Sequence, residues 1–181
     1  MGALLSHDGR VALVTVDELR PYPRLDVVRE APIVQMIADK ETPAPSERMT
    51  PIVLGPKDVP EMLDLAEQTH PGPFGPRTHE LGQYIGVRID GALAAMAGER
   101  MRLDGAVEIS AVCVSPDHRG KGYAAFLVAW LVRKLRGEGA MPFLHAFTDN
   151  PAIALYERLG FTTRKTLRLT VLARARELSD S

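Results

Sequence analysis

The sequence predicts an α/β domain built on a mixed β-sheet, and three observations support this. Apolar segments between residues 82 and 114 are separated by the tight turns Asp90-Gly91 and Asp104-Gly105, which is typical of an antiparallel meander. A segment at about residues 122–136 repeats its apolar side chains at helical spacing. With 181 residues, the chain is long enough to bury one core of ordinary size.

The other elements of this domain are expected in a regular order. A short strand at 49–54 precedes a helix within 56–70, with Asp58 as its N-cap and Glu61 completing a capping box. After the helix at 122–136 we expect a strand at 141–147 and a helix at 150–160. Asn150 is the expected N-cap of that last helix, with Pro151 in its first turn. A final pair of strands is expected around 161–174.

Residues 1–48 are expected to form an N-terminal arm in front of a domain at 49–181. The apolar runs 11–16 and 27–38 favour two short strands, with Pro32 breaking the second, and the segment 41–51 has the composition of a linker. About 45 residues are too few to fold alone. The arm should therefore pack on the domain or on a second subunit, which would be compatible with a homodimer.

Composition excludes several classes of function. The net charge of -1, from 22 basic and 23 acidic residues, gives no field that would recruit nucleic acid or a membrane surface. A single cysteine, Cys113, excludes an intrachain disulfide and a cysteine-rich metal site, and it suits the cytoplasm. His70, His79, His118 and His145 form no helical metal-binding pair, so no metal is expected.

The stretch VSPDHRGKGYAAFL, residues 114–127, joins a predicted strand to a predicted helix. A glycine-containing turn before a helix makes an anion site, because the first helical N–H groups have no internal partners and carry the positive end of the dipole. Arg119 and Lys121 add positive charge. Gly122 follows Lys121 where a phosphate loop of a nucleotide triphosphatase needs Ser or Thr, so that class is disfavoured, although a nucleotide-binding domain stays a third alternative.

Two motifs, in this order, resemble the GNAT superfamily of acyl-CoA-dependent N-acyltransferases over about residues 50–172. HRGKGYA fits the pattern Arg-x-x-Gly-x-Ala, and NPAIALYERLGF carries an Ala, a Tyr four residues later and then Leu-Gly-Phe. The resemblance implies a GNAT-like sheet in which strands 106–114 and 141–147 run parallel and splay apart at a bulge. The wedge between them would hold acetyl-CoA. One departure is Asp149, where the family usually has the Asn that here comes one residue later.

The resemblance also implies which residues contact the cofactor. Backbone groups near Val112 and Val114 would bind the pantetheine arm, the amides of residues 119–124 would hold the pyrophosphate, and an N–H within 111–113 would steady the oxyanion. The full set of expected cofactor contacts is Val112, Cys113, Val114, Arg119, Gly120, Lys121, Gly122, Tyr123, Ala124, Asn150, Ala152 and Tyr156.

Two residues are the expected catalytic groups. By resemblance, Tyr156 would protonate the departing thiolate, the alternative being a tyrosine that only packs on its helix. Glu108 would accept the proton of the amine, with its pKa raised by burial between strands, the alternative being an ordinary strand glutamate. Glu99 could assist or replace it, as could water. A covalent role for Cys113 is disfavoured, because cysteines within strands are usually inert.

The expected function is transfer of an acetyl or short acyl group from acetyl-CoA to a primary amine by direct attack in a ternary complex. Phe74, Arg77 and His79, in a loop rich in Pro and Gly, are the expected acceptor contacts together with Glu99. The segment GPFGPRTHELGQYIGV looks closest to the glycine N-acyltransferase-like branch, which favours a small amino compound. A non-catalytic acyl-CoA-binding or regulatory module is the alternative.

Overall fold

The computed structural model describes residues 2–5, 10–19 and 24–174, and these contain one mixed sheet of nine strands with three α-helices. The strands are β1 (Gly2–Leu5), β2 (Arg10–Thr15), β3 (Leu25–Ala38), β4 (Ile52–Leu54), β5 (Tyr84–Ile89), β6 (Ala92–Leu103), β7 (Ala106–Val114), β8 (Met141–Phe147) and β9 (Phe161–Arg174). The helices are α1 (Val59–Thr69), α2 (Tyr123–Gly137) and α3 (Ile153–Arg158). Their spatial order in the sheet is β1-β2-β9-β3-β8-β7-β6-β5-β4, so the predicted mixed α/β fold is confirmed.

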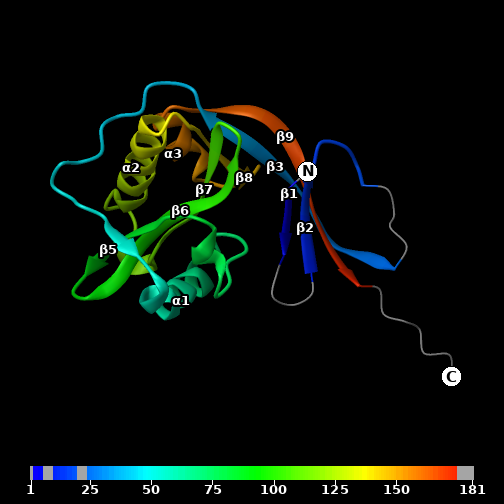
Figure 1. The fold of residues 1–181 in the computed structure, drawn as a ribbon, viewed down its shortest axis with the longest axis horizontal. Coiled ribbons are helices and arrows are strands. Elements are labelled where there is room, and N and C mark those ends of the chain that lie inside the picture. Colours follow the sequence, from blue (N-terminus) through cyan, green and yellow to red (C-terminus); the bar gives the residue numbers. More distant parts are fainter. Residues whose placement is uncertain (1, 6–9, 20–23, 175–181) are drawn as a thin grey trace.

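Helices cover both faces of the part of the sheet that contains β5 to β8 (Figure 1). On one face α2 buries Leu127, Leu131 and Leu135 in the main core with the strands. On the other face α1 packs Met62 and Leu65 in a second cluster, which includes Tyr84 and Met96. The first ten residues of α2 are all apolar and its charged residues lie near its C-terminal end, so burying the apolar face against the sheet fixes the helix in place.

The N-terminal segment is a structural part of the common sheet. β3 pairs with β8 on one side and with β9 on the other, while β1, β2 and the outer parts of β3 and β9 extend away from the helices (Figure 1). The predicted short strand at 11–16 is β2, whereas the prediction for 27–38 is wrong, since β3 spans 14 residues and continues through Pro32; β1 was not predicted. Pairing with β8 begins only at Ile33, so Pro32 lies where β3 still has an open edge and a missing N–H is tolerated. The boundary at residue 48 stays a prediction.

The predicted capping box of α1 does not form. Asp58 is the N-cap residue, but its carboxylate accepts the N–H of Gly55 at 2.9 Å instead of a helix N–H. Arg88 on β5 binds both Asp58 and Glu61, so the two acidic residues join the helix start to the sheet. The backbone bond to Gly55 and the contact with Arg88 hold the pKa of Asp58 below its usual range, against the effect of burial.

The C-terminal elements differ from the prediction in two details. α3 begins at Ile153 with Ala152 as its N-cap residue, although the side chain of Asn150 still accepts the N–H of Ala152 at 2.8 Å. The predicted strand pair is the single long strand β9. Gly160 joins α3 to β9 with φ of 87°, and a β-carbon there would lie 2.5 Å from the carbonyl oxygen of Glu41. Glycine is therefore required in the Leu-Gly-Phe run.

No helix in the described part of the chain is long and apolar enough to span a bilayer.

Candidate active site

A wedge opens between β7 and β8, the only parallel pair among the described strands. Their register runs from Ala106 opposite Met141 to Glu108 opposite Phe143 and then stops, although both strands continue. The cavity that opens beyond this point has a volume of about 900 Å³. It is lined by the separated halves of both strands, by α3, by the start of α2 and by the loop 70–73.

A β-bulge in β7 accompanies this separation. Met96 on β6 lies opposite Cys113 and Gly98 lies opposite Ser110, so two residues of β7 face the single residue Ala97. Ala111 takes φ of 52°, which is unusual for a residue other than glycine. The bulge at Ala111 thus lies where β7 faces the cavity, and the predicted splaying of the two strands at a bulge is confirmed.

The turn before α2 places backbone N–H groups at one end of the cavity. Gly120 and Gly122 take φ of 75° and 83°, in the left-handed region that favours glycine. The first hydrogen bond within the helix runs from the N–H of Phe126 to the carbonyl of Gly122. The N–H groups of residues 123–125 therefore have no acceptor within the helix. With Arg119 also in the lining, this end of the cavity suits an anion such as a phosphate.

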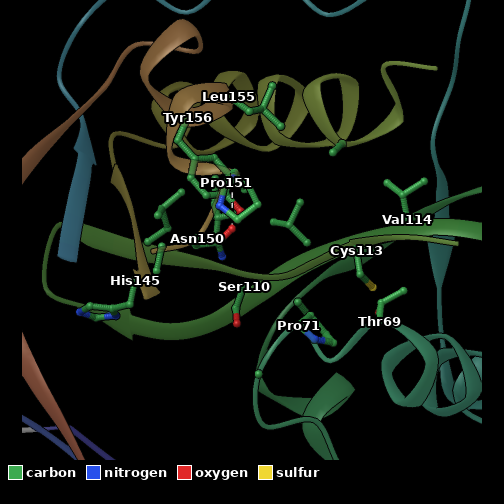
Figure 2. A pocket seen from close by; sticks show the side chains of 18 of the residues that line it. Thr69, Pro71, Ser110, Cys113, Val114, His145, Asn150, Pro151, Leu155 and Tyr156 are labelled. Carbon is green, nitrogen blue, oxygen red and sulfur yellow. Dashed lines mark hydrogen bonds between the residues drawn. The ribbon is translucent and has the colours of Figure 1, made fainter. Parts of the chain in front are cut away.

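Tyr156 reaches from α3 toward β7 and lines the cavity. Figure 2 shows it between Cys113 and Val114 at one end and His145 at the other, with Asn150 beside it. Burial raises the pKa of Tyr156 to about 12, so the phenol keeps its proton at neutral pH. A buried, protonated phenol at this position is able to donate a proton to a leaving group.

Cys113 points toward α1 from the far side of the bulge. Burial raises the pKa of its thiol to about 11, so the thiol stays protonated at neutral pH and is a weak nucleophile. Its surroundings are those of a packing residue in the cluster with Met96 and Leu65.

Glu108 is fully buried beneath the cavity wall and does not line the cavity. Its carboxylate accepts two hydrogen bonds from Arg100, at 3.0 and 2.6 Å, and one from Nδ1 of His145 at 2.8 Å. Burial alone would raise the pKa of Glu108, but the bonds from His145 and Arg100 outweigh it and hold the pKa below its ordinary value. The expectation of a raised pKa is therefore wrong, because the sequence did not reveal these two partners.

Nearly all of the expected cofactor contacts line the cavity. The lining includes Val112, Cys113, Val114, Arg119, Gly120, Gly122, Tyr123, Ala124, Asn150, Ala152 and Tyr156. Lys121 is the exception, since its side chain is exposed and outside the lining.

The expected acceptor contacts do not line the cavity. Glu99 lies on the α2 face of the sheet, where it pairs with Lys134 and Arg102. Phe74 packs edge-on against Tyr84. Arg77 is exposed and paired with Glu80, and His79 bonds the carbonyl of Pro76. The neighbouring residues 70–73 border the cavity instead.

Several lining residues escaped the sequence reasoning. Arg100 and His145 contribute side chains that are 11% exposed, and His118 has a buried Nδ1 without a partner among the described residues. The arm supplies Val14 from β2 and Ile33 from β3. The only local signal for His145 was its place directly after the apolar residues Phe143 and Leu144 in a predicted strand. The arm contacts depend on pairings over more than 100 residues.

The fold and the site together are those of an acyltransferase. Among solved structures, a GNAT-family protein from Novosphingobium aromaticivorans DSM 12444 is 43% identical, covers 92% of this chain and 75% of its own, and superposes with a TM-score of 0.86. The family described as FR47-like protein matches residues 84–169. The chain belongs to the GNAT family of N-acetyltransferases, and it is an acyltransferase.

More distant structures share the fold alone. A GCN5-related N-acetyltransferase from Kribbella flavida is 23% identical, with 86% of this chain and 62% of that chain covered and a TM-score of 0.58. The ribosomal-protein-S18-alanine N-acetyltransferase from Escherichia coli is 22% identical, with coverages of 73% and 97% and a TM-score of 0.56. A search of curated proteins found no match. The glycine N-acyltransferase-like branch is not confirmed by these relatives.

Proposed function

We propose that the protein transfers an acetyl or short acyl group from acetyl-CoA to a primary amine of a small compound. The observation that carries this proposal is the cavity between the splayed strands β7 and β8, with an anion-binding turn at one end and Tyr156 in its lining. Acetyl-CoA has the matching features, a pyrophosphate, a long pantetheine arm and a reactive thioester at its tip.

In this proposal the backbone does most of the cofactor binding. The pyrophosphate binds the N–H groups of the turn 119–124, and Arg119 adds charge to it. The pantetheine arm lies along β7 and bonds backbone groups near Val112 and Val114, as an added strand does at an open edge. The bulge at Ala111 turns an N–H of residues 111–113 toward the thioester carbonyl, where it stabilises the oxyanion.

The chemical step is a direct attack. The amine nitrogen bonds to the thioester carbon and loses a proton to a base or to water, the C–S bond then breaks, and Tyr156 gives its phenolic proton to the sulfur. Solvent returns a proton to the phenolate. The products are an amide and CoA, and the charges balance.

The acceptor occupies the opposite end of the cavity from the anion-binding turn. Apolar side chains in the rest of the lining come from the arm (Val14, Ile33), from β9 (Leu169) and from the loop 70–73 (Pro71, Pro73). These surroundings favour an amine attached to an apolar group over a charged protein tail.

The test is release of the CoA thiol from acetyl-CoA in the presence of an amine panel containing glycine, benzylamine and 2-phenylethylamine. We expect amine-dependent release, with an acetylated amine identified by mass spectrometry, and faster turnover of the two aromatic compounds. Cofactor binding without release by any amine would favour a non-catalytic acyl-CoA-binding module.

A further inference from the structure

We propose that the imidazole of His145 accepts the proton from the attacking amine, and that Glu108 is the positioning residue that holds this imidazole. The inference rests on the proposed function and names the base of that reaction. Glu108 has no exposed surface and lies outside the cavity lining, whereas His145 is part of the lining.

A hydrogen-bond chain fixes the tautomer of His145. Nδ1 lies 2.8 Å from Oε1 of Glu108, an ionised carboxylate that can only accept, so Nδ1 carries the hydrogen. At the other ring nitrogen, Nε2 of Gln35 lies 3.2 Å away. Arg164 donates to Oε1 of Gln35 at 2.8 Å, so the amide NH2 of Gln35 faces the ring and donates to it. Nε2 of His145 therefore presents a lone pair.

A lone pair at Nε2 is what a general base needs. In this structure Nε2 accepts from Gln35, and an amine N–H takes the place of this weak neutral donor when the acceptor binds. As the N–C bond forms, the amine proton moves to Nε2, and the imidazolium that results remains bonded to the Glu108 carboxylate. The imidazolium later gives the proton to solvent.

The other groups around His145 are consistent with this role. Arg100 on β6 donates two hydrogen bonds to Glu108. The carboxylate therefore interacts with both the Arg100 guanidinium and the imidazole. The ring of Phe143 on β8 packs edge-on, with centroids 5.7 Å apart. From β3 and β9 come the neutral Gln35 and, behind it, Arg164. Contacts from β7, β8 and β3 thus orient the imidazole, with Arg100 on β6 and Arg164 on β9 holding its partners Glu108 and Gln35.

The first measurement needs no acceptor. Two-dimensional NMR of the full chain labelled with ¹⁵N-histidine should show the resonances of His145, assigned by their loss in His145→Gln, in the Nδ1–H tautomer near neutral pH. A dominant Nε2–H tautomer would leave no lone pair toward the acceptor and would overturn the proposal.

The second measurement is the ratio of wild-type to His145→Gln kcat/KM as a function of pH, with the fastest amine of the panel. The ratio cancels the titration of the amine itself. It should rise with pH and reach a plateau of about 100-fold, because only the neutral imidazole accepts a proton. A constant ratio would mean a structural role. His145→Asn serves as the second variant if the glutamine variant does not fold.

Glu108→Gln separates positioning from proton transfer. It keeps the shape of the side chain and removes the charge, and we expect kcat to fall about tenfold with little change in KM. Glu67→Gln, at an exposed position on α1, is the matched control and should retain wild-type kcat. Absence of amine-dependent release by the wild type would overturn the proposed function and this inference together, whereas turnover with wild-type kcat in His145→Gln would overturn the inference alone.

Discussion

Replacing Tyr156 by phenylalanine should reduce kcat about 100-fold and leave the affinity for acetyl-CoA unchanged. The phenol is buried in the lining of the cavity, and its raised pKa, about 12, keeps it protonated until the thiolate departs. Phenylalanine fills the same space against Phe161 but has no proton to give. Steady-state kinetics with the fastest amine and calorimetric titration with acetyl-CoA measure the two quantities separately.

The matched control for this variant is Tyr84→Phe. Tyr84 is as deeply buried, it lies outside the cavity lining, and its hydroxyl has no hydrogen-bond partner among the described residues. Removing that hydroxyl should leave kcat unchanged and should not lower the stability. Wild-type kcat in Tyr156→Phe would show that the sulfur takes its proton from elsewhere.

Replacing Arg100 by methionine should lower the free energy of unfolding by about 3 kcal/mol at neutral pH. Glu108 would keep only the bond from His145, and a fully buried carboxylate would lose its cation. Adding Glu108→Gln to the variant removes the unpaired charge and should restore part of the loss. Chemical denaturation of the single and double variants tests this, and an Arg100→Met variant as stable as wild type would contradict it.

The same ion pair has a defined pH dependence. The pKa of Glu108 is lower in the folded protein than its ordinary value of 4.5. Its contribution to stability is therefore complete above pH 4.5 and is lost as the pH falls toward the lower folded pKa. The wild type should consequently lose stability more steeply below pH 4.5 than Glu108→Gln does.

Local patterns in the sequence predicted the elements of the domain well. The turns Asp90-Gly91 and Asp104-Gly105 set the limits of β5, β6 and β7, and the apolar spacing predicted α2 within one residue at each end. These features depend on neighbours in the chain. Most of the residues from the turn before α2 and from the run Asn150 to Tyr156 line the cavity as predicted for the same reason, because both segments are contiguous.

The acceptor end could not be predicted in this way, because its residues meet only through distant pairings. β3 lies between β8 and β9, so Gln35 reaches His145 across 110 residues of sequence. Glu99 and Glu108 look equivalent in the sequence, yet Glu99 faces Lys134 on α2 while Glu108 lies beneath the cavity wall. The register of β6 with β7 decides which carboxylate is near the site, because Glu99 lies opposite Ile109 and so points to the other face from Glu108.

The central claim is that the wedge between β7 and β8 binds acyl-CoA through the turn before α2, and calorimetric titration with acetyl-CoA, CoA and ATP tests it most directly. We predict micromolar affinity for acetyl-CoA and for CoA and no measurable binding of ATP, because ATP lacks the pantetheine arm that lies along β7. Failure of both CoA ligands to bind, or equally tight binding of ATP, would contradict the account.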